Sequence, residues 1–300
     1  MDNINKIFII NLDKDIERLN EAKKQLNKYN ITNYERISGI NGSKLTEQEK
    51  KLITTDVGNI LASDSMIGCG ISHINLWKRI IDDGIEKCLI LEDDFILEDN
   101  FINKFNDAYK YCPDNYDLLF LTANPIHNKN LRISNINKYF YKQLFVSQTL
   151  AYIITIDGAK KLLNHINKIS YHIDVEIGLT ALLNQDINII SLKERLVYQI
   201  YDMTSYNINN CNYPLIIDKL FEKNNFLNYS YKVVLFSIGG FNINVNILLI
   251  ILLGYLSIKL SILLIIIEFF LFNDKKINIE VLFYLFIGYL IKVILYGLYY

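Results

Sequence analysis

The first two hundred residues alternate short apolar runs with longer segments of helical periodicity. The apolar run at 7–12 is short and contains β-branched residues, which is typical of a strand, and we also predict strands at 34–40 and 88–91. Between them, apolar residues return at helical spacing, so we predict one helix that begins near Ile16 and another over 68–83.

The same alternation continues to residue 191. We predict later elements at 101–112 (helix), 117–122 (strand), 149–156 (strand), 157–166 (helix), 174–185 (helix) and 187–191 (strand). Alternating strands and helices predict an α/β fold, with a mainly parallel sheet that carries helices on both faces. In such sheets ligands bind at the carboxyl ends of the strands.

The pattern changes near residue 240. Two long apolar runs follow, at 247–272 with only Lys259 and Glu268 charged, and at 281–300 with only Lys292 charged. Each is long enough to cross a bilayer as a helix, although a pair of buried helices is the alternative.

These runs suggest three parts of the chain. We predict a catalytic domain at 1–210, a linker at 211–240, and a membrane-associated helical hairpin at 241–300. The apolar run at 7–10 is too short for the core of a signal peptide. We therefore expect no signal peptide, and a catalytic domain that stays on the cytosolic side of a membrane.

Charge and cysteine content exclude some classes of protein. The chain carries 31 basic and 32 acidic residues, a net charge of −1, so we expect no nucleic-acid partner. The four cysteines lie far apart and form no CxxC pair, which favours reduced thiols over a disulfide framework or a zinc motif.

Three carboxylates, Glu92, Asp93 and Asp94, follow the apolar run at 88–91 directly. The chain has neither GxGxxG nor GxxxxGK[ST] after a strand, so no glycine-rich loop is available for a phosphate. Clustered carboxylates offer another device, because they bind Mg2+ or Mn2+, which then bridges to phosphate oxygens. A solvated loop or a helix cap is the alternative interpretation.

Six motifs in order resemble glycosyltransferase family 25. They are "IFIINLDKDIERL" (7–19), "ERISGING" (35–42), "IGCGISHINLWKRII" (67–81), "CLILEDDFILE" (88–98), "YIITIDGAKKLL" (152–163) and "HIDVE" (172–176). That family contains lipooligosaccharide galactosyltransferases and relatives of the collagen hydroxylysine galactosyltransferase. The resemblance covers about residues 5 to 200.

The resemblance implies a GT-A-type, Rossmann-like domain that takes a UDP-sugar as donor. It implies Mn2+ or Mg2+ on Glu92 and Asp94, with Glu92 or Asp93 also holding metal-bound water or ribose. The implied reaction is a single displacement that inverts the anomeric carbon of a hexose, galactose in particular. Its acceptor would be a hydroxyl of a glycan, a glycolipid such as lipopolysaccharide, or a hydroxylated protein.

Other candidate site residues have two interpretations each. Asp174 or Glu176 would be the base, yet both lie where a helix begins and could cap it. His73 would contact the donor or serve as a buried structural histidine. Arg18 would bind the diphosphate or uracil or lie in solvent, and Asn11 follows the first strand, where the nucleotide base would lie.

Two rival functions remain open. One is an inactive module that binds sugar nucleotides and is tethered by the apolar tail. The other is a hydrolase with two facing carboxylates, which would need neither metal nor nucleotide.

Overall fold

The computed structural model divides the chain into two units, Met1–Ile200 and Tyr201–Tyr300. It describes residues 4–122, 132–143, 148–184, 186–200, 232–239, 241–272 and 275–297. The predicted boundary at 210 lies outside the described residues and stays a prediction.

The first unit is built around an eight-stranded sheet in the order β2-β1-β3-β8-β5-β9-β7-β6. In this order, the strands are β2 (Glu35–Gly39), β1 (Lys6–Leu12), β3 (Lys87–Glu92), β8 (Ala151–Thr155), β5 (Leu118–Phe120), β9 (Ile189–Leu192), β7 (Phe140–Gln143) and β6 (Arg132–Asn135). Only β8 and β7 are antiparallel to both of their neighbours, so the other strands of this sheet run in one direction. The prediction of a mainly parallel sheet is confirmed.

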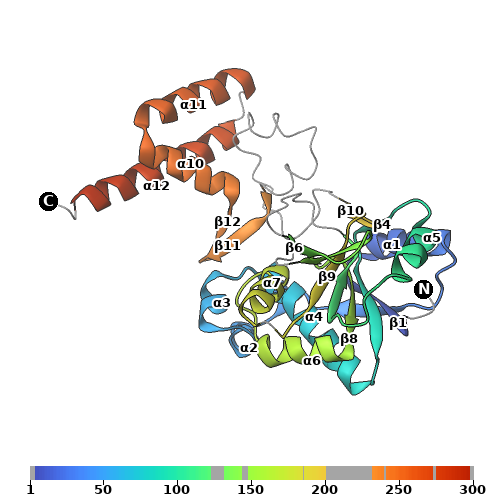
Figure 1. Cartoon of the computed structure of the whole chain (residues 1–300). Coiled ribbons are helices and arrows are strands. Elements are labelled where there is room, and N and C mark those ends of the chain that lie inside the picture. The colour runs from blue at the N-terminus through green and yellow to red at the C-terminus, as the bar shows by residue number, and fades with distance from the viewer. Residues whose placement is uncertain are drawn as a thin grey trace. The chain divides into compact units, whose positions relative to one another are not determined.

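Helices cover both faces of the sheet, as predicted (Figure 1). One face packs against α1 (Ile16–Lys28) and α5 (Phe101–Tyr109). The opposite face packs against α4 (Asp64–Asp82), α6 (Ile156–His165) and α7 (Ile173–Leu183).

The sequence of β1 and β3 explains why both faces are apolar. Successive side chains of a strand point to opposite faces. In β1, Ile7 and Ile9 therefore join the cluster under α1 and α5, while Phe8 joins the cluster under α4 and α6. Leu89 and Ile90 of β3 divide in the same way, and all but Ile7, at 7%, are at most 1% exposed.

Several short elements were not predicted. The structure adds η1 (Gly42–Lys44), α2 (Glu47–Ile53), α3 (Asp56–Leu61), β6, β7, and the two-stranded pair of β4 (Phe95–Leu97) and β10 (Val197–Gln199). Their runs are too short for a clear period in the sequence. Thr155 caps α6, because its hydroxyl accepts the Gly158 N–H at 3.0 Å.

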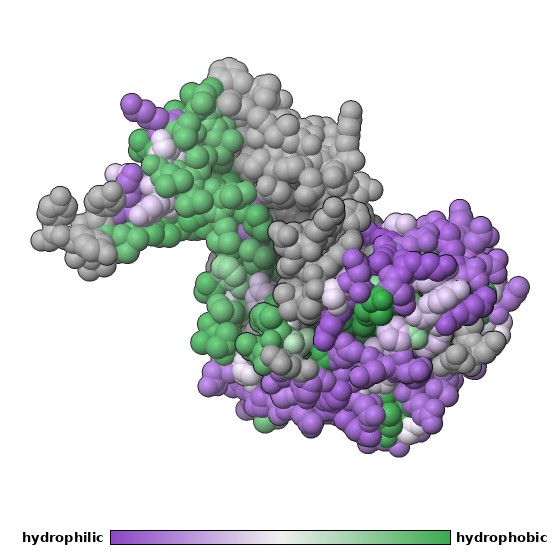
Figure 2. Space-filling view, in the orientation of Figure 1, coloured by the Kyte–Doolittle hydropathy of each residue, from purple (hydrophilic) through white to green (hydrophobic). Residues whose placement is uncertain are grey.

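Among its described residues, the second unit contains a hairpin and three helices. They are β11 (Val234–Ile238), β12 (Phe241–Asn244), α10 (Val245–Leu256), α11 (Ile258–Phe272) and α12 (Lys275–Gly297). Figure 2 shows hydrophobic residues gathered on this unit, whereas much of the first unit's visible surface is hydrophilic.

The apolar run at 247–272 is not one helix. Ser257 adopts an extended conformation, with φ −155° and ψ 112°, and separates α10 from α11. Its hydroxyl accepts the Leu260 N–H at 3.3 Å, as an N-cap does. The resulting helices have 12 and 15 residues, fewer than the roughly 20 that span a bilayer.

Residues 281–297 of the second run belong to α12, whose 23 residues also include Lys275, Lys276 and Glu280. Across the described ranges, no helix combines the length and the apolar composition that a membrane crossing requires. The structure therefore does not support the prediction of two membrane-crossing helices, although it does contain helices in both apolar runs.

Two glycines let α10 and α12 pack closely, and this predicts a large effect of a small substitution. A Cβ on Gly254 would lie 2.1 Å from the Leu285 carbonyl oxygen, and one on Gly288 would lie 1.9 Å from the Ile251 oxygen. Because backbone must move to admit the methyl group, we expect Gly254→Ala to destabilise the helix pair by about 1–3 kcal/mol. Hydrogen exchange over 245–256, followed by mass spectrometry, measures this loss.

The control is Leu252→Ala on the same helix, where the side chain is 48% exposed. An exposed substitution of this kind changes stability by about 0.5 kcal/mol or less. Equal protection of the two variants would show that the glycine contact does not hold the helices together.

Candidate active site

The three carboxylates lie where β3 ends, as predicted. Glu92 is the last residue of β3, and Asp93 and Asp94 form the turn that leads into β4. Backbone hydrogen bonds hold this turn, because the Glu92 N–H donates to the Leu150 oxygen at 2.9 Å and the Ile200 N–H donates to the Asp94 oxygen at 2.8 Å.

Asp93 is held from the neighbouring strand. The Asn11 amide at the end of β1 donates to Asp93 Oδ2 at 2.7 Å, and Asn11 itself is 2% exposed. Arg36 donates from Nε to Asn11 Oδ1 at 2.9 Å. Asn11 thus supports the acidic turn in this structure, and its contact with a nucleotide base stays a prediction.

Arg18 of α1 bridges two of the carboxylates. Its Nη2 lies 3.0 Å from Asp93 Oδ1 and 2.8 Å from Asp94 Oδ2. The guanidinium side chain is only 21% exposed, so the pairing takes place in a partly dry environment. Arg18 is therefore bound to the acidic turn rather than solvated.

Asp94 combines deep burial with an unused oxygen. Burial raises its pKa to about 7, although the Arg18 charge opposes the shift, and burial likewise raises the pKa of Asp93. Within the described part of the chain, Asp94 Oδ1 is buried and makes no hydrogen bond. A buried acceptor without a partner calls for a bound group, and hard oxygen ligands of this kind fit Mg2+ or Mn2+.

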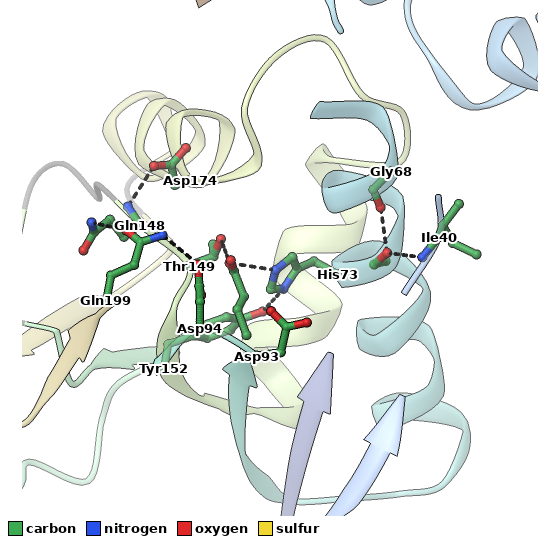
Figure 3. A network of polar contacts seen from close by, with 12 residues as sticks. Ile40, Gly68, His73, Asp93, Asp94, Gln148, Thr149, Tyr152, Asp174 and Gln199 are labelled. Carbon is green, nitrogen blue, oxygen red and sulfur yellow. Dashed lines mark hydrogen bonds and ion pairs between the residues drawn. The ribbon is translucent and has the colours of Figure 1, made fainter. Parts of the chain in front are cut away.

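Glu92 faces a different set of side chains (Figure 3). Its Oε1 accepts the Thr149 hydroxyl at 2.6 Å and lies 3.4 Å from His73 Nε2. His73 is fully buried and contacts the Tyr152 hydroxyl through Nδ1 at 2.9 Å. Burial alone would raise the pKa of Glu92, but the bonds from His73 and Thr149 outweigh it and the net shift is downward.

A line of hydrogen bonds connects Asp94 with Asp174 (Figure 3). Gln199 at the end of β10 donates to Asp94 Oδ2 at 3.0 Å and accepts from Gln148 Nε2 at 2.9 Å. The Gln148 backbone N–H then donates to Asp174 Oδ2 at 2.8 Å. The acidic turn and the start of α7, far apart in sequence, thus belong to one polar network.

Gln148 adopts a backbone conformation that a non-glycine residue seldom takes, with φ +99°. Such a conformation costs on the order of 1–3 kcal/mol and persists only where the surroundings hold it. Here the bonds to Asp174 and Gln199 hold it, and this turn presents Thr149 to Glu92.

Glu176 points away from this network. Its Oε1 accepts the backbone N–H groups of Ser170 and Tyr171 at 2.5 and 2.6 Å. Burial raises its pKa, and these two hydrogen bonds oppose the shift. Glu176 therefore fixes the segment before α7, in keeping with its structural interpretation.

Cys69 lies one helical turn before His73 on α4 and completes a cluster of possible metal ligands. One ligand atom each from Cys69, His73 and Glu92 lie within 4.8 Å of one another. Burial raises the pKa of the Cys69 thiol well above its ordinary value, and the charges of Glu92, Asp174 and Asp94 raise it further.

The structure brings together most of the predicted site residues. Four of them lie in one connected set of contacts: Asn11, Arg18, Asp93 and Asp94. His73 lies 3.4 Å from Glu92, which directly precedes Asp93 in the chain. Asp174 joins through Gln148, and Glu176 does not. Sequence reasoning missed Gln148, Thr149 and Gln199. The one feature of the sequence that could have indicated them is their position at or beside the end of a strand.

Comparisons with known proteins agree with the geometry. A family model described as "Glycosyltransferase family 25 (LPS biosynthesis protein)" matches residues 4–177. Among curated relatives, "Glycosyltransferase 25 family member" of Anopheles gambiae is 26% identical over 175 residues, covering 53% of this chain and 28% of the relative. "Procollagen galactosyltransferase 2" of Homo sapiens is 24% identical over 173 residues, covering 52% and 27%.

A third relative comes from a virus. "Procollagen lysyl hydroxylase and glycosyltransferase" of Acanthamoeba polyphaga mimivirus is 26% identical over 177 residues, covering 54% of this chain and 20% of the relative. The chain thus matches less than a third of the length of each of these proteins. Because the family model covers more than half of it, the chain belongs to glycosyltransferase family 25, and the resemblance of its motifs is confirmed.

Proposed function

We propose that the first unit transfers a hexose, galactose in particular, from a UDP-sugar to an acceptor hydroxyl, in a metal-dependent reaction that inverts the anomeric carbon. The observation that carries this proposal is the polar network that joins Asp94, with its unpartnered buried oxygen, to Asp174. This network supports the proposal because it links a candidate cation ligand in the turn after β3 with a candidate base at the start of α7.

Asp94 and Glu92 would hold the divalent cation through carboxylate oxygens, and Asn11 would keep Asp93 beside them. A bound Mg2+ or Mn2+ supplies charge that neutralises the diphosphate as UDP leaves, so that no acid is needed at the leaving group. Arg18 would move from the carboxylates toward the diphosphate, since a guanidinium binds phosphate oxygens in a bidentate way.

Asp174 is our choice for the base. It would take the proton of the acceptor hydroxyl while the hydroxyl oxygen forms the new bond to the anomeric carbon and the bond to UDP breaks. The backbone N–H groups of Gln148 and Val175 hold its two oxygens in place at 2.8 Å each. Each oxygen keeps a further lone pair for a proton.

The acceptor follows from the relatives as a proposal only. Two of them carry names that refer to procollagen, and the family description refers to lipopolysaccharide biosynthesis. Both acceptor types present a hydroxyl, on a glycan or on a hydroxylated side chain, and the mechanism requires nothing else of them.

A donor screen tests the proposal. We expect the full-length chain with Mn2+ to release UDP slowly from UDP-galactose, and to lose this activity when the metal is removed with a chelator. Other UDP-sugars would serve as specificity controls. Neither UDP binding nor UDP release in the presence of Mn2+ or Mg2+ would contradict the proposal and favour the inactive module, whereas metal-independent hydrolysis of a glycoside would favour the hydrolase.

Arg18 provides a prediction about metal affinity. In the absence of donor, its guanidinium occupies the carboxylates that a cation would need. A unit charge about 4 Å from a cation in a partly dry site changes the free energy of cation binding by several kcal/mol at an intermediate dielectric constant. Part of the gain from removing the Arg18 charge is offset, because the ion pairs of Arg18 with the carboxylates are lost too. We therefore expect Arg18→Met to bind Mn2+ about tenfold more tightly in a titration followed by electron paramagnetic resonance.

The matched control is Lys28→Met, also on α1, whose ammonium pairs with Asp99 at 3.0 Å on the exposed surface. Its Mn2+ affinity should equal that of the wild type. Weaker Mn2+ binding by Arg18→Met would show that Arg18 supports the cation rather than competing with it.

A further inference from the structure

A row of fully buried side chains with polar atoms leads to Glu92, and Figure 3 shows Tyr152 and His73 of this row. Trp77 Nε1 lies 2.9 Å from the Tyr152 oxygen, and that oxygen lies 2.9 Å from His73 Nδ1. His73 Nε2 lies 3.4 Å from Glu92 Oε1. Each of the three side chains behind Glu92 has an exposed fraction of 0%.

Donor chemistry fixes the direction of this row. An indole N–H can only donate, so the Tyr152 oxygen accepts from Trp77. The single hydroxyl hydrogen of Tyr152 then needs an acceptor, and His73 Nδ1 is the one found among the described residues. The neutral imidazole therefore carries its hydrogen on Nε2, which faces Glu92.

We propose that Trp77, Tyr152 and His73 are positioning residues, which hold the Nε2–H of His73 toward Glu92 and so orient its carboxylate toward the donor. His73 Nε2 is buried without a hydrogen-bond partner among the described residues, and Glu92 Oε1 lies 3.4 Å from it. Thr149 donates a hydrogen bond to the same oxygen at 2.6 Å. Together the Thr149 hydroxyl and the His73 Nε2–H fix the rotation of the carboxylate and leave Oε2 for the cation or the ribose. The identity of that ligand rests on the proposed function, but the orientation of Glu92 does not.

The same atoms are also candidates for a zinc site, because Cys69, His73 and Glu92 offer ligands within 4.8 Å of one another. Zinc would require the lone pair of a ring nitrogen. Nδ1 accepts from Tyr152, and Nε2 carries the hydrogen that this bond leaves to it. A metal on Nε2 would turn Nδ1 into a donor and leave the Tyr152 hydrogen buried without an acceptor, which is costly.

Removal of one hydroxyl tests the proposal in the full-length chain. Tyr152→Phe deletes the link between Trp77 and His73 and little else. Since one hydrogen bond is at stake, we expect Mn2+-dependent UDP binding to weaken about three- to tenfold in calorimetry. The control is Tyr116→Phe, a core tyrosine at 4% exposure whose hydroxyl lies 2.9 Å from that of Tyr109.

Both variants lose one buried hydroxyl, so a purely structural effect would lower the melting temperature of both and leave UDP affinity the same in both. Equal UDP affinities would thus overturn the proposal. His73→Gln adds a rescue, because its amide can place an N–H where Nε2 was. We expect it to bind UDP within about threefold of the wild type, and His73→Leu to bind more weakly than His73→Gln.

Nuclear magnetic resonance tests the hydrogen-bond direction without any donor. In chain labelled with 15N-histidine, the signals that disappear in His73→Gln belong to His73. We expect a protonated Nε2 and an unprotonated Nδ1, and a shifted Nδ1 signal in Tyr152→Phe. A protonated Nδ1, or the binding of one equivalent of Zn2+ that requires His73, would overturn the proposal. If the wild-type chain showed the expected signals but did not bind UDP, only the proposed function would be contradicted.

Discussion

Asp94→Asn should abolish sugar transfer while leaving the fold intact. We expect a loss of about 10³-fold or more in kcat, in the range seen when a main electrostatic contact to the transition state is removed, together with the loss of metal-dependent UDP binding. The physical reason is that an amide offers one neutral oxygen, whereas Asp94 Oδ1 is a buried carboxylate oxygen without a hydrogen-bond partner in the described residues. The release of UDP from UDP-galactose, with and without Mn2+, measures the effect.

The fold should survive this change, because burial already disfavours the charge of Asp94 and raises its pKa to about 7. A neutral amide is easier to bury at that position. Melting temperature should therefore stay at or above the wild-type value in the absence of metal. Asp99→Asn is the control, since the Asp99 side chain is 85% exposed and its ion pair among the described residues is with the surface Lys28. Normal sugar transfer by Asp94→Asn would exclude Asp94 as a metal ligand.

The acidic end of the site follows from the sequence for a simple reason. An apolar run that passes directly into Glu92, Asp93 and Asp94 predicts a strand whose carboxyl end carries carboxylates, and β3 ends at Glu92. Asn11 follows from the same rule, because β1 is the parallel neighbour of β3 and the two strands end at the same edge.

The rest of the site depends on strand direction, which hydrophobic pattern does not reveal. β8 is antiparallel to β3, with Leu91 opposite Ala151, so the beginning of β8 lies beside the carboxylates. This is why Thr149, just before β8, contacts Glu92. Gln199 arrives by a similar route, because β10 pairs with β4 and places Gln199 opposite Phe95.

Run length misled the prediction in the second unit. A window of apolar residues at 247–272 does not show that Ser257 will leave the helical conformation and cap the next helix. Serine competes with the helix for backbone hydrogen bonds, and one such residue suffices to divide a run that is long enough on hydropathy alone.

The choice between Asp174 and Glu176 yields the second large prediction. We expect Asp174→Asn to lower kcat for sugar transfer about 10²- to 10⁴-fold, which is the contribution of a general base. Mn2+-dependent UDP affinity should change less than about threefold, since the base meets the acceptor and not the donor. Comparing transfer to an acceptor with calorimetric binding of UDP separates these two effects.

Glu176→Gln is a matched control for charge, because the amide oxygen can still accept the N–H groups of Ser170 and Tyr171 that Oε1 now accepts. Its kcat should stay within about threefold of the wild type, whereas Glu176→Ala should lose about 1–3 kcal/mol of unfolding free energy because two partly buried N–H groups lose their acceptor. If Glu176→Gln instead lost transfer and Asp174→Asn kept it, Glu176 would be the base. Asp174, which the polar network reaches from Asp94 through Gln199 and Gln148, would then serve only as a helix cap.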